Sequence, residues 1–189
     1  PPRLRVLSRG QRVLLFFGLV LSGLLAVSGV YLLGHTLFSF VTGRSADHYL
    51  SHLVFAAHLG LGLVVTPLVL TFLAQHLRLG IAHPNVAARR RGYLLMAAVA
   101  VVLVTGLLLL RIEAGGRVLG FVGGLPRRGL WLLHLAAPAF VVGLFVFHRK
   151  VSRPINWHIG QVGLIWVGAA LVGLLVLHTQ DPRRWWMKA

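Results

Sequence analysis

The sequence contains no cysteine among its 189 residues and only three acidic residues, Asp47, Glu113 and Asp181. The missing thiols exclude disulfides, thiolate metal sites, iron–sulfur clusters and covalently attached haem on this chain. None of the acids falls within a long apolar run, which argues against a proton or metal transporter with carboxylates inside the membrane. A redox group would therefore need other ligands, and the chain has ten histidines.

Charged residues are scarce as well, at 12% of the chain, whereas 57% of the residues are hydrophobic. A soluble domain of this length needs a more polar surface than that. The apolar residues do not alternate with polar ones, as they do in barrel strands, but form runs near the ~20 residues that a helix needs to cross a bilayer. We therefore predict an all-α integral membrane bundle of about five transmembrane helices, over residues 13–33, 49–77, 93–110, 130–148 and 159–177.

The basic residues of the predicted loops indicate the orientation. With the N-terminus inside, eleven of the nineteen lysines and arginines fall on the inner side, and all three acids fall outside. We predict a multi-pass protein of the bacterial inner membrane, and the positive-inside rule predicts a cytoplasmic N-terminus and an extracytoplasmic C-terminus. The net charge of +16 is topological in this interpretation, and no nucleic-acid partner is expected.

Two histidines of the fourth predicted span, His134 and His148, are fourteen residues apart. In a helix this spacing brings them within about 40° of a shared face and about 21 Å apart along the axis. Ionisable residues inside a membrane are rare and usually functional, and imidazole is a good ligand for haem iron. One helix can thus present one imidazole to each of two b-type haems stacked across the bilayer.

The second predicted span supplies candidates for the opposite ligands. His58 and His76 are eighteen residues apart, which is five whole turns, so they share one face and lie about 27 Å apart. His52 competes with His58 for the outer haem, because its depth better matches that of His134. At the outer end of the fifth span, His178 either ligates or contacts a haem near the outer surface, or anchors its helix. Interfacial hydrogen-bonding roles are expected for the remaining histidines, His35, His48, His83 and His158.

Three stretches along the chain carry a family resemblance. They are Leu19-Val20-Leu21-Ser22-Gly23 in the first span, Leu103-Val104-Thr105-Gly106 in the third, and the spacing of His134 and His148 in the fourth. In this order they resemble the membrane-bound di-haem cytochrome b subunits of formate dehydrogenases and nickel–iron hydrogenases, the cytochrome b561-like group. The resemblance covers about residues 9–153. It implies a four-helix haem-binding core over residues 1–153, with residues 154–189 forming an additional transmembrane helix and an outer tail.

The resemblance also implies ligands for the two haems. The outer haem would be held by His134 and a second-span histidine, His58 or His52. The family's inner haem uses a histidine of the first helix near the inner rim, and residues 9–12 of this chain include none. Either the inner haem is absent, or another histidine faces His148 in its place. We expect that replacement to be His76, whose depth fits, rather than His83 or His158.

The predicted function is that of a di-haem b-type cytochrome that transfers electrons between the quinone pool and an extracytoplasmic redox subunit, either a cytochrome c or an iron–sulfur protein. The chain would then be the electron-transfer membrane subunit of a quinone-linked respiratory oxidoreductase complex, and the resemblance implies a quinone near the inner haem. The alternative is a haem-free membrane anchor that tethers a periplasmic redox or multihaem subunit. In either case the partner is expected over His134, the Arg127-Arg128 loop and the basic tail after Leu177.

Overall fold

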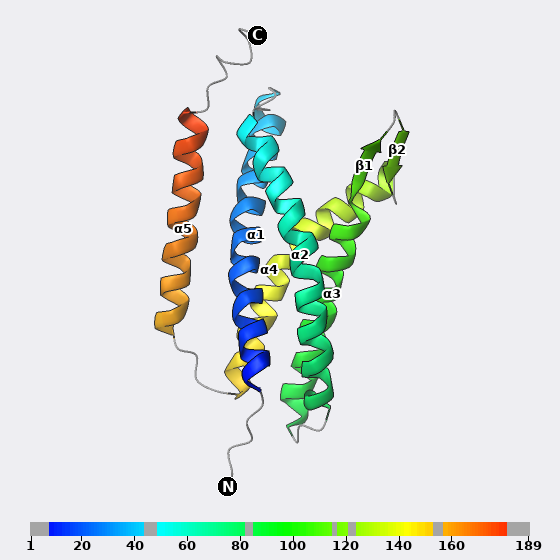
Figure 1. Ribbon diagram of the computed structural model, residues 1–189, viewed down its shortest axis with the longest axis vertical. Helices are drawn as coiled ribbons and strands as arrows, with labels where there is room; N and C mark the ends of the chain where they lie inside the picture. Colours follow the sequence, from blue (N-terminus) through cyan, green and yellow to red (C-terminus); the bar gives the residue numbers. More distant parts are fainter. Residues whose placement is uncertain are drawn as a thin grey trace. The chain divides into compact units, whose positions relative to one another are not determined.

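The computed structural model describes residues 8–43, 49–81, 85–114, 117–120, 124–152 and 157–180. These residues form five α-helices and one short β-hairpin (Figure 1). All five helices are long and apolar enough to cross a membrane, so the predicted all-α, multi-pass membrane fold is confirmed. In chain order the elements are α1 (Arg9–Thr42), α2 (Tyr49–Gly80), α3 (Val86–Leu108), β1 (Arg111–Ala114), β2 (Arg117–Gly120), α4 (Gly124–Ser152) and α5 (Trp157–Gln180).

The helices extend beyond the predicted spans, and α1 shows why. It has 34 residues, which corresponds to about 51 Å, whereas the hydrocarbon core of a bilayer is about 30 Å thick. The helix begins at Ser8, which forms a reciprocal capping box with Gln11, and it ends at Gly43, whose φ of 64° is left-handed. Hydropathy marks only the apolar part, but the hydrogen-bond ladder continues until a capping residue ends it. His35, predicted at a span end, therefore lies inside α1.

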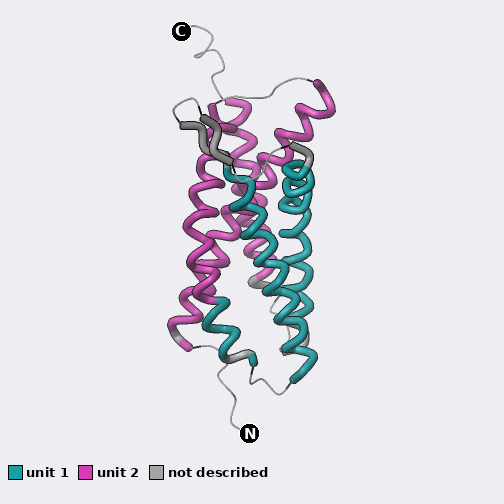
Figure 2. The backbone as a smooth tube through the Cα atoms, turned by 90° about the vertical axis from the view of Figure 1, so that its right-hand side faces the viewer, with its two compact units in different colours: residues 1–6, 73–155 teal, residues 7–72, 156–189 magenta. Residues whose placement is uncertain are grey.

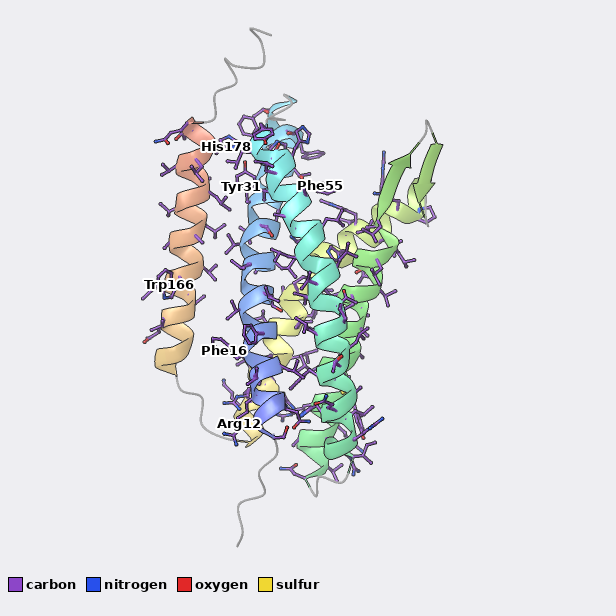
Figure 3. The ribbon with its side chains drawn as sticks, viewed as in Figure 1. Arg12, Phe16, Tyr31, Phe55, Trp166 and His178 are labelled. Carbon is purple, nitrogen blue, oxygen red and sulfur yellow. The ribbon has the colours of Figure 1, made fainter. Side chains whose placement is uncertain are left out.

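Large apolar side chains cover the outside of the helices. On α5, Leu164 is 74% exposed and Trp166 is 72% exposed, and Figure 3 shows Trp166 on the side of the helix away from α1. On α4, Phe140 is 68% exposed. Exposed apolar area on this scale is unfavourable in water, because each Å² left in water costs about 25 cal/mol. Lipid removes that cost, and the arrangement is the one expected of helices surrounded by a bilayer.

Contacts divide the chain into two compact units, coloured separately in Figure 2. Unit 1 contains the end of α2 from Leu73 onward, α3, the hairpin and α4, and within it α3 packs against α4. Unit 2 contains α1, α2 up to Phe72, and α5, and within it α5 contacts α1. The division by contact differs from the predicted boundary after residue 153. That boundary concerned which helices hold haem, and it stays a prediction.

The hairpin was not predicted, since residues 111–120 were assigned to an outer loop. Its strands are antiparallel, with Arg111 opposite Gly120 and Ala114 opposite Arg117. In the sequence, the two strands are separated by Gly115-Gly116, a dipeptide that two-residue hairpin connections favour. Each strand has only four residues, too few for a clear alternation of apolar and polar positions, so hydropathy alone does not reveal them.

Ala137 of α4 offers a test of helix packing. It is 5% exposed and lies three residues after His134. Ala137→Leu forces a larger side chain into this position and should lower the free energy of unfolding by about 1–3 kcal/mol. The exposed neighbour Ala139 is the matched control, and Ala139→Leu should change it by no more than about 0.5 kcal/mol. Thermal unfolding in one detergent measures both variants, and equal stability would show that Ala137 is not a packing position.

Candidate functional site

His134 of α4 lies directly against α3, within unit 1. Its Nδ1 is 3.1 Å from the hydroxyl oxygen of Thr105. A Cβ built on the next residue, Gly106, would lie 3.0 Å from Cε1 of the imidazole ring and 3.6 Å from Nδ1. Real Cβ atoms rarely come that close to a neighbour, so a side chain at position 106 would displace the ring. The histidine therefore depends on a glycine whose backbone it can touch.

The contacts of the Thr105 hydroxyl favour one position for the proton of His134. Its oxygen is 2.7 Å from the carbonyl oxygen of Val101 and 3.1 Å from that of Val102. Carbonyls only accept hydrogen bonds, so the single hydroxyl hydrogen is donated to one of them. With its hydrogen on a carbonyl, the hydroxyl oxygen is placed to accept from Nδ1–H of His134, the tautomer that this arrangement favours. In the neutral ring this leaves the lone pair on Nε2, the atom that can bind a metal.

His58 of α2 is held in the same way by α1, within unit 2. Its Nδ1 is 2.9 Å from Oγ of Ser28, and that oxygen is 3.0 Å and 3.1 Å from the carbonyl oxygens of Leu24 and Leu25. A Cβ on Gly29 would lie 3.4 Å from Cε1 of the ring. The same reasoning puts the proton on Nδ1 and the lone pair on Nε2. We call Ser28-Gly29 and Thr105-Gly106 the two hydroxyl–glycine pairs.

His148, at the other end of α4, also rests on a glycine of α3. A Cβ on Gly92 would lie 3.4 Å from its Cε1 and 3.7 Å from its Nδ1. Gly92 and Gly106 are fourteen residues apart on α3, as His134 and His148 are on α4, and the two helices run in opposite directions (Figure 1). One antiparallel register therefore produces both contacts, about 21 Å apart along the helices.

The structure brings His76 into the same unit as His148. His76 lies in the last part of α2, which belongs to unit 1, close enough to His148 for the two rings to repel each other when both are protonated. The Nδ1 atoms of both rings are buried. These two histidines were predicted to face the inner haem together. Their proximity supports that pairing, although ligation itself stays a prediction.

His178 of α5 contacts Tyr31 of α1, and the two labelled side chains lie next to each other in Figure 3. The tyrosine hydroxyl is 3.0 Å from Nδ1 of His178, and the two rings meet edge to face with centroids 6.0 Å apart. Tyr31 is 7% exposed. A part-buried hydrogen bond of this kind joins two helices, so His178 anchors α5 to α1. A contact between His178 and a haem stays a prediction.

For the other predicted histidines, the described part of the structure gives no contact that supports a role in binding haem. His52 is exposed on α2. His48 and His83 lie outside the described residues, as does the side chain of His158 in α5. His58 and His134 belong to different units, so their joint ligation of one iron stays a prediction. Among the residues that the structure describes, no three or more His, Cys, Asp or Glu side chains form a group able to hold a bare metal ion.

The sequence pattern missed two of the glycine contacts. In α1 it pointed to Ser22-Gly23, but nothing lies within 4 Å of a Cβ on Gly23, and the pair that holds His58 is Ser28-Gly29. Gly92 was not singled out at all. Two signals were available: a hydroxyl residue followed by glycine inside a span, and glycines repeating at the same fourteen-residue spacing as the histidines.

Gly106→Ala tests the closest of these contacts. The added methyl group would lie 3.0 Å from the His134 ring, so we expect the free energy of unfolding to fall by about 1–3 kcal/mol. On α5, Gly168 has nothing within 4 Å of its Cβ position, so Gly168→Ala should instead gain up to about 1 kcal/mol from helix propensity. The change in the free energy of unfolding of Gly29→Ala should lie between those of Gly106→Ala and Gly168→Ala. Unfolding measured in one detergent gives all three values, and equal stabilisation at positions 106 and 168 would contradict the contact.

Comparisons with known proteins give this chain no relative. No protein-family model, no curated protein and no solved structure matches it. The likeness to the cytochrome b subunits of formate dehydrogenases and hydrogenases therefore rests on two short stretches and one spacing. The function has to be inferred from the side-chain geometry of the two units.

Proposed function

We propose that this protein is a di-haem b-type membrane cytochrome that transfers electrons between the quinone pool and an extracytoplasmic redox subunit. The observation that carries the proposal is the pair of glycine–histidine contacts between α3 and α4. His134 rests on Gly106 and His148 rests on Gly92, within one compact unit. The two imidazoles are separated by about 21 Å along the helices, which fits two haems stacked inside a hydrocarbon core about 30 Å thick.

The donor set suits haem iron better than a bare metal ion. Haem supplies four nitrogen ligands of its own, so the protein needs to add only two imidazoles at each iron. The absence of larger His or carboxylate groups among the described residues is therefore compatible with haem. When bound, haem b would supply a one-electron iron couple. Two axial histidines keep the iron six-coordinate, which favours electron transfer over oxygen binding.

Four histidines are the proposed axial ligands. His134 and His58 would hold the outer haem, with His52 as the other candidate on α2. The hydroxyl–glycine pairs support His58 over His52, because they leave the Nε2 lone pair of His58 for a metal, whereas His52 is exposed. His148 and His76 would hold the inner haem, and their proximity within unit 1 supports this pair.

The proposed setting is the bacterial inner membrane, with the N-terminus in the cytoplasm, the quinone near the inner haem and the partner at the outer face. Arg127 donates to the carbonyl oxygen of Leu109 at 2.9 Å, which ties the start of α4 to the end of α3. Arg128 is exposed and is the better candidate for contact with an acidic partner, a cytochrome c or an iron–sulfur protein. The tail from residue 181 onward lies outside the described residues.

A haem-free membrane anchor for a periplasmic redox subunit is the second candidate. It would explain the five apolar helices and the basic outer segments equally well. It would not explain why buried hydroxyls on two different helices contact the Nδ1 atoms of imidazoles. An anchor has no use for that arrangement, because burying polar groups in a membrane is costly.

Haem content separates the two candidates. The full-length protein, expressed with an adequate haem supply and purified in mild detergent, should carry about two non-covalent b haems per chain. Its reduced-minus-oxidised spectrum should show the bands of low-spin bis-histidine haem b, and pyridine haemochrome should give the stoichiometry. A protein that is folded by circular dichroism and yet devoid of haem would favour the anchor.

Single histidine variants assign the haems to levels in the membrane. His134→Ala and His148→Ala should each lose one haem, and not the same one, because the two imidazoles are about 21 Å apart along α4. His76→Ala should reproduce the loss seen in His148→Ala. Redox titration followed by optical spectroscopy identifies the haem that remains by its potential. Two low-spin haems retained in both α4 variants would show that the ligands lie elsewhere.

A further inference from the structure

We infer that the two hydroxyl–glycine pairs, Ser28-Gly29 and Thr105-Gly106, are positioning residues for metal-binding histidines. Each pair holds the proton of its histidine on Nδ1, keeps the ring against a helix backbone, and so makes Nε2 the atom offered to the iron. The role of the pairs in setting the iron's potential rests on the proposed function. The tautomer that they impose does not.

The same arrangement occurs twice, on helices of different units. In each pair the hydroxyl oxygen lies within hydrogen-bond distance of Nδ1, at 2.9 Å from His58 and 3.1 Å from His134. The following glycine meets Cε1, the ring carbon next to Nδ1. Both hydroxyl residues are buried, Thr105 at 3% exposure and Ser28 at 7%. Two independent occurrences of one geometry argue for a shared requirement rather than for a packing accident.

Each hydroxyl acts as an acceptor because its own hydrogen is already used. Ser28 and Thr105 both contact carbonyl oxygens three and four residues earlier in their own helix. In an apolar interior a ring N–H without an acceptor is strongly disfavoured, so the proton stays on the nitrogen that faces the hydroxyl. A ligand imidazole whose other N–H is hydrogen-bonded is also more basic and has a fixed ring plane. The pairs therefore govern both orientation and ligand strength.

The contact at His148 lacks the hydroxyl of such a pair. The residue before Gly92 is Arg91, and a guanidinium has no acceptor that could receive Nδ1–H. Arg91 instead donates to the carbonyl oxygen of Phe147 at 3.3 Å, and so joins α3 to α4 through the backbone. The inference is accordingly confined to His58 and His134, the two histidines proposed to hold the outer haem.

Nitrogen NMR of the full-length protein labelled with ¹⁵N at histidine tests the tautomer in the haem-free protein. In the haem-loaded protein, with the iron reduced and diamagnetic, iron at Nε2 itself keeps the proton on Nδ1, and the signal reports only the hydrogen bond to the hydroxyl. In the wild type, the resonances of His58 and His134 should report a protonated, hydrogen-bonded Nδ1; His58→Gln and His134→Gln assign them by their loss. Thr105→Val keeps the shape of the side chain but removes the acceptor, so the hydrogen-bonded Nδ1 signal of His134 should disappear. Thr105→Ser should restore it. Likewise, Ser28→Ala should remove the hydrogen-bonded Nδ1 signal of His58, and Ser28→Thr should restore it.

The control is Thr71→Val, which removes an exposed hydroxyl that donates to the Pro67 carbonyl oxygen of its own helix. It should leave both histidine signals unchanged.

In the haem-loaded protein, Thr105→Val should also raise the midpoint potential of one haem, because a weaker imidazole donor stabilises the ferric state less. Thr105→Ser should keep the wild-type potential.

The outcomes distinguish the two proposals. A protein that binds no haem, but loses the His134 signal in Thr105→Val and regains it in Thr105→Ser, would overturn the cytochrome function and uphold the tautomer. A haem-loaded protein whose Thr105→Val variant keeps both the signal and the potential would overturn the positioning role and leave the cytochrome intact. Wild-type protein with the proton on Nε2 of His134 would overturn the inference directly.

Discussion

The contact between an imidazole ring and a helix backbone without a Cβ is the constraint on which unit 1 depends. Gly106 leaves room for His134, whose ring would lie 3.0 Å from a Cβ there, whereas a Cβ on Gly92 would be in ordinary van der Waals contact with His148 at 3.4 Å. The equal spacing of the two pairs fits one antiparallel register of α3 and α4. A shift of one residue would move a side chain under each ring. The packing of the two helices and the placement of the two histidines are therefore a single structural fact.

Polar groups inside these helices are few; some donate to carbonyl oxygens of their own helix, as Thr66 and Thr71 do, and others hold histidines or join helices. Hydroxyls of Ser28 and Thr105 hold His58 and His134, while the hydroxyl of Tyr31 joins α1 to His178. A hydrogen bond in an apolar medium cannot be replaced by water, so each of these contacts restricts ring orientation more than it would in a soluble protein. The apolar exterior places these hydrogen bonds in lipid, which offers the imidazole rings no competing hydrogen-bond partner.

Much of the fold follows from the sequence because its cause is local. Runs of about twenty apolar residues must be helical in a bilayer, whatever their neighbours are, and five such runs became five helices. The relation between His134 and His148 is also local, since a helix fixes the angle and rise between two of its own residues. The ends of the helices were less predictable, because capping residues such as Ser8 and Gly43 lie beyond the apolar stretch that hydropathy detects.

By itself, the sequence determined the class of protein, the five spans and the presentation of two imidazoles by one helix. Tertiary structure alone decided what each imidazole touches. Helix α1 is apolar all round, and both Ser22-Gly23 and Ser28-Gly29 occur on it, so only its rotation and axial position relative to α2 select the pair that meets His58. The choice of Gly92 under His148, and of Tyr31 beside His178, depends in the same way on how two helices pack. A nearly uniform apolar surface carries no periodic signal that would specify such contacts in advance.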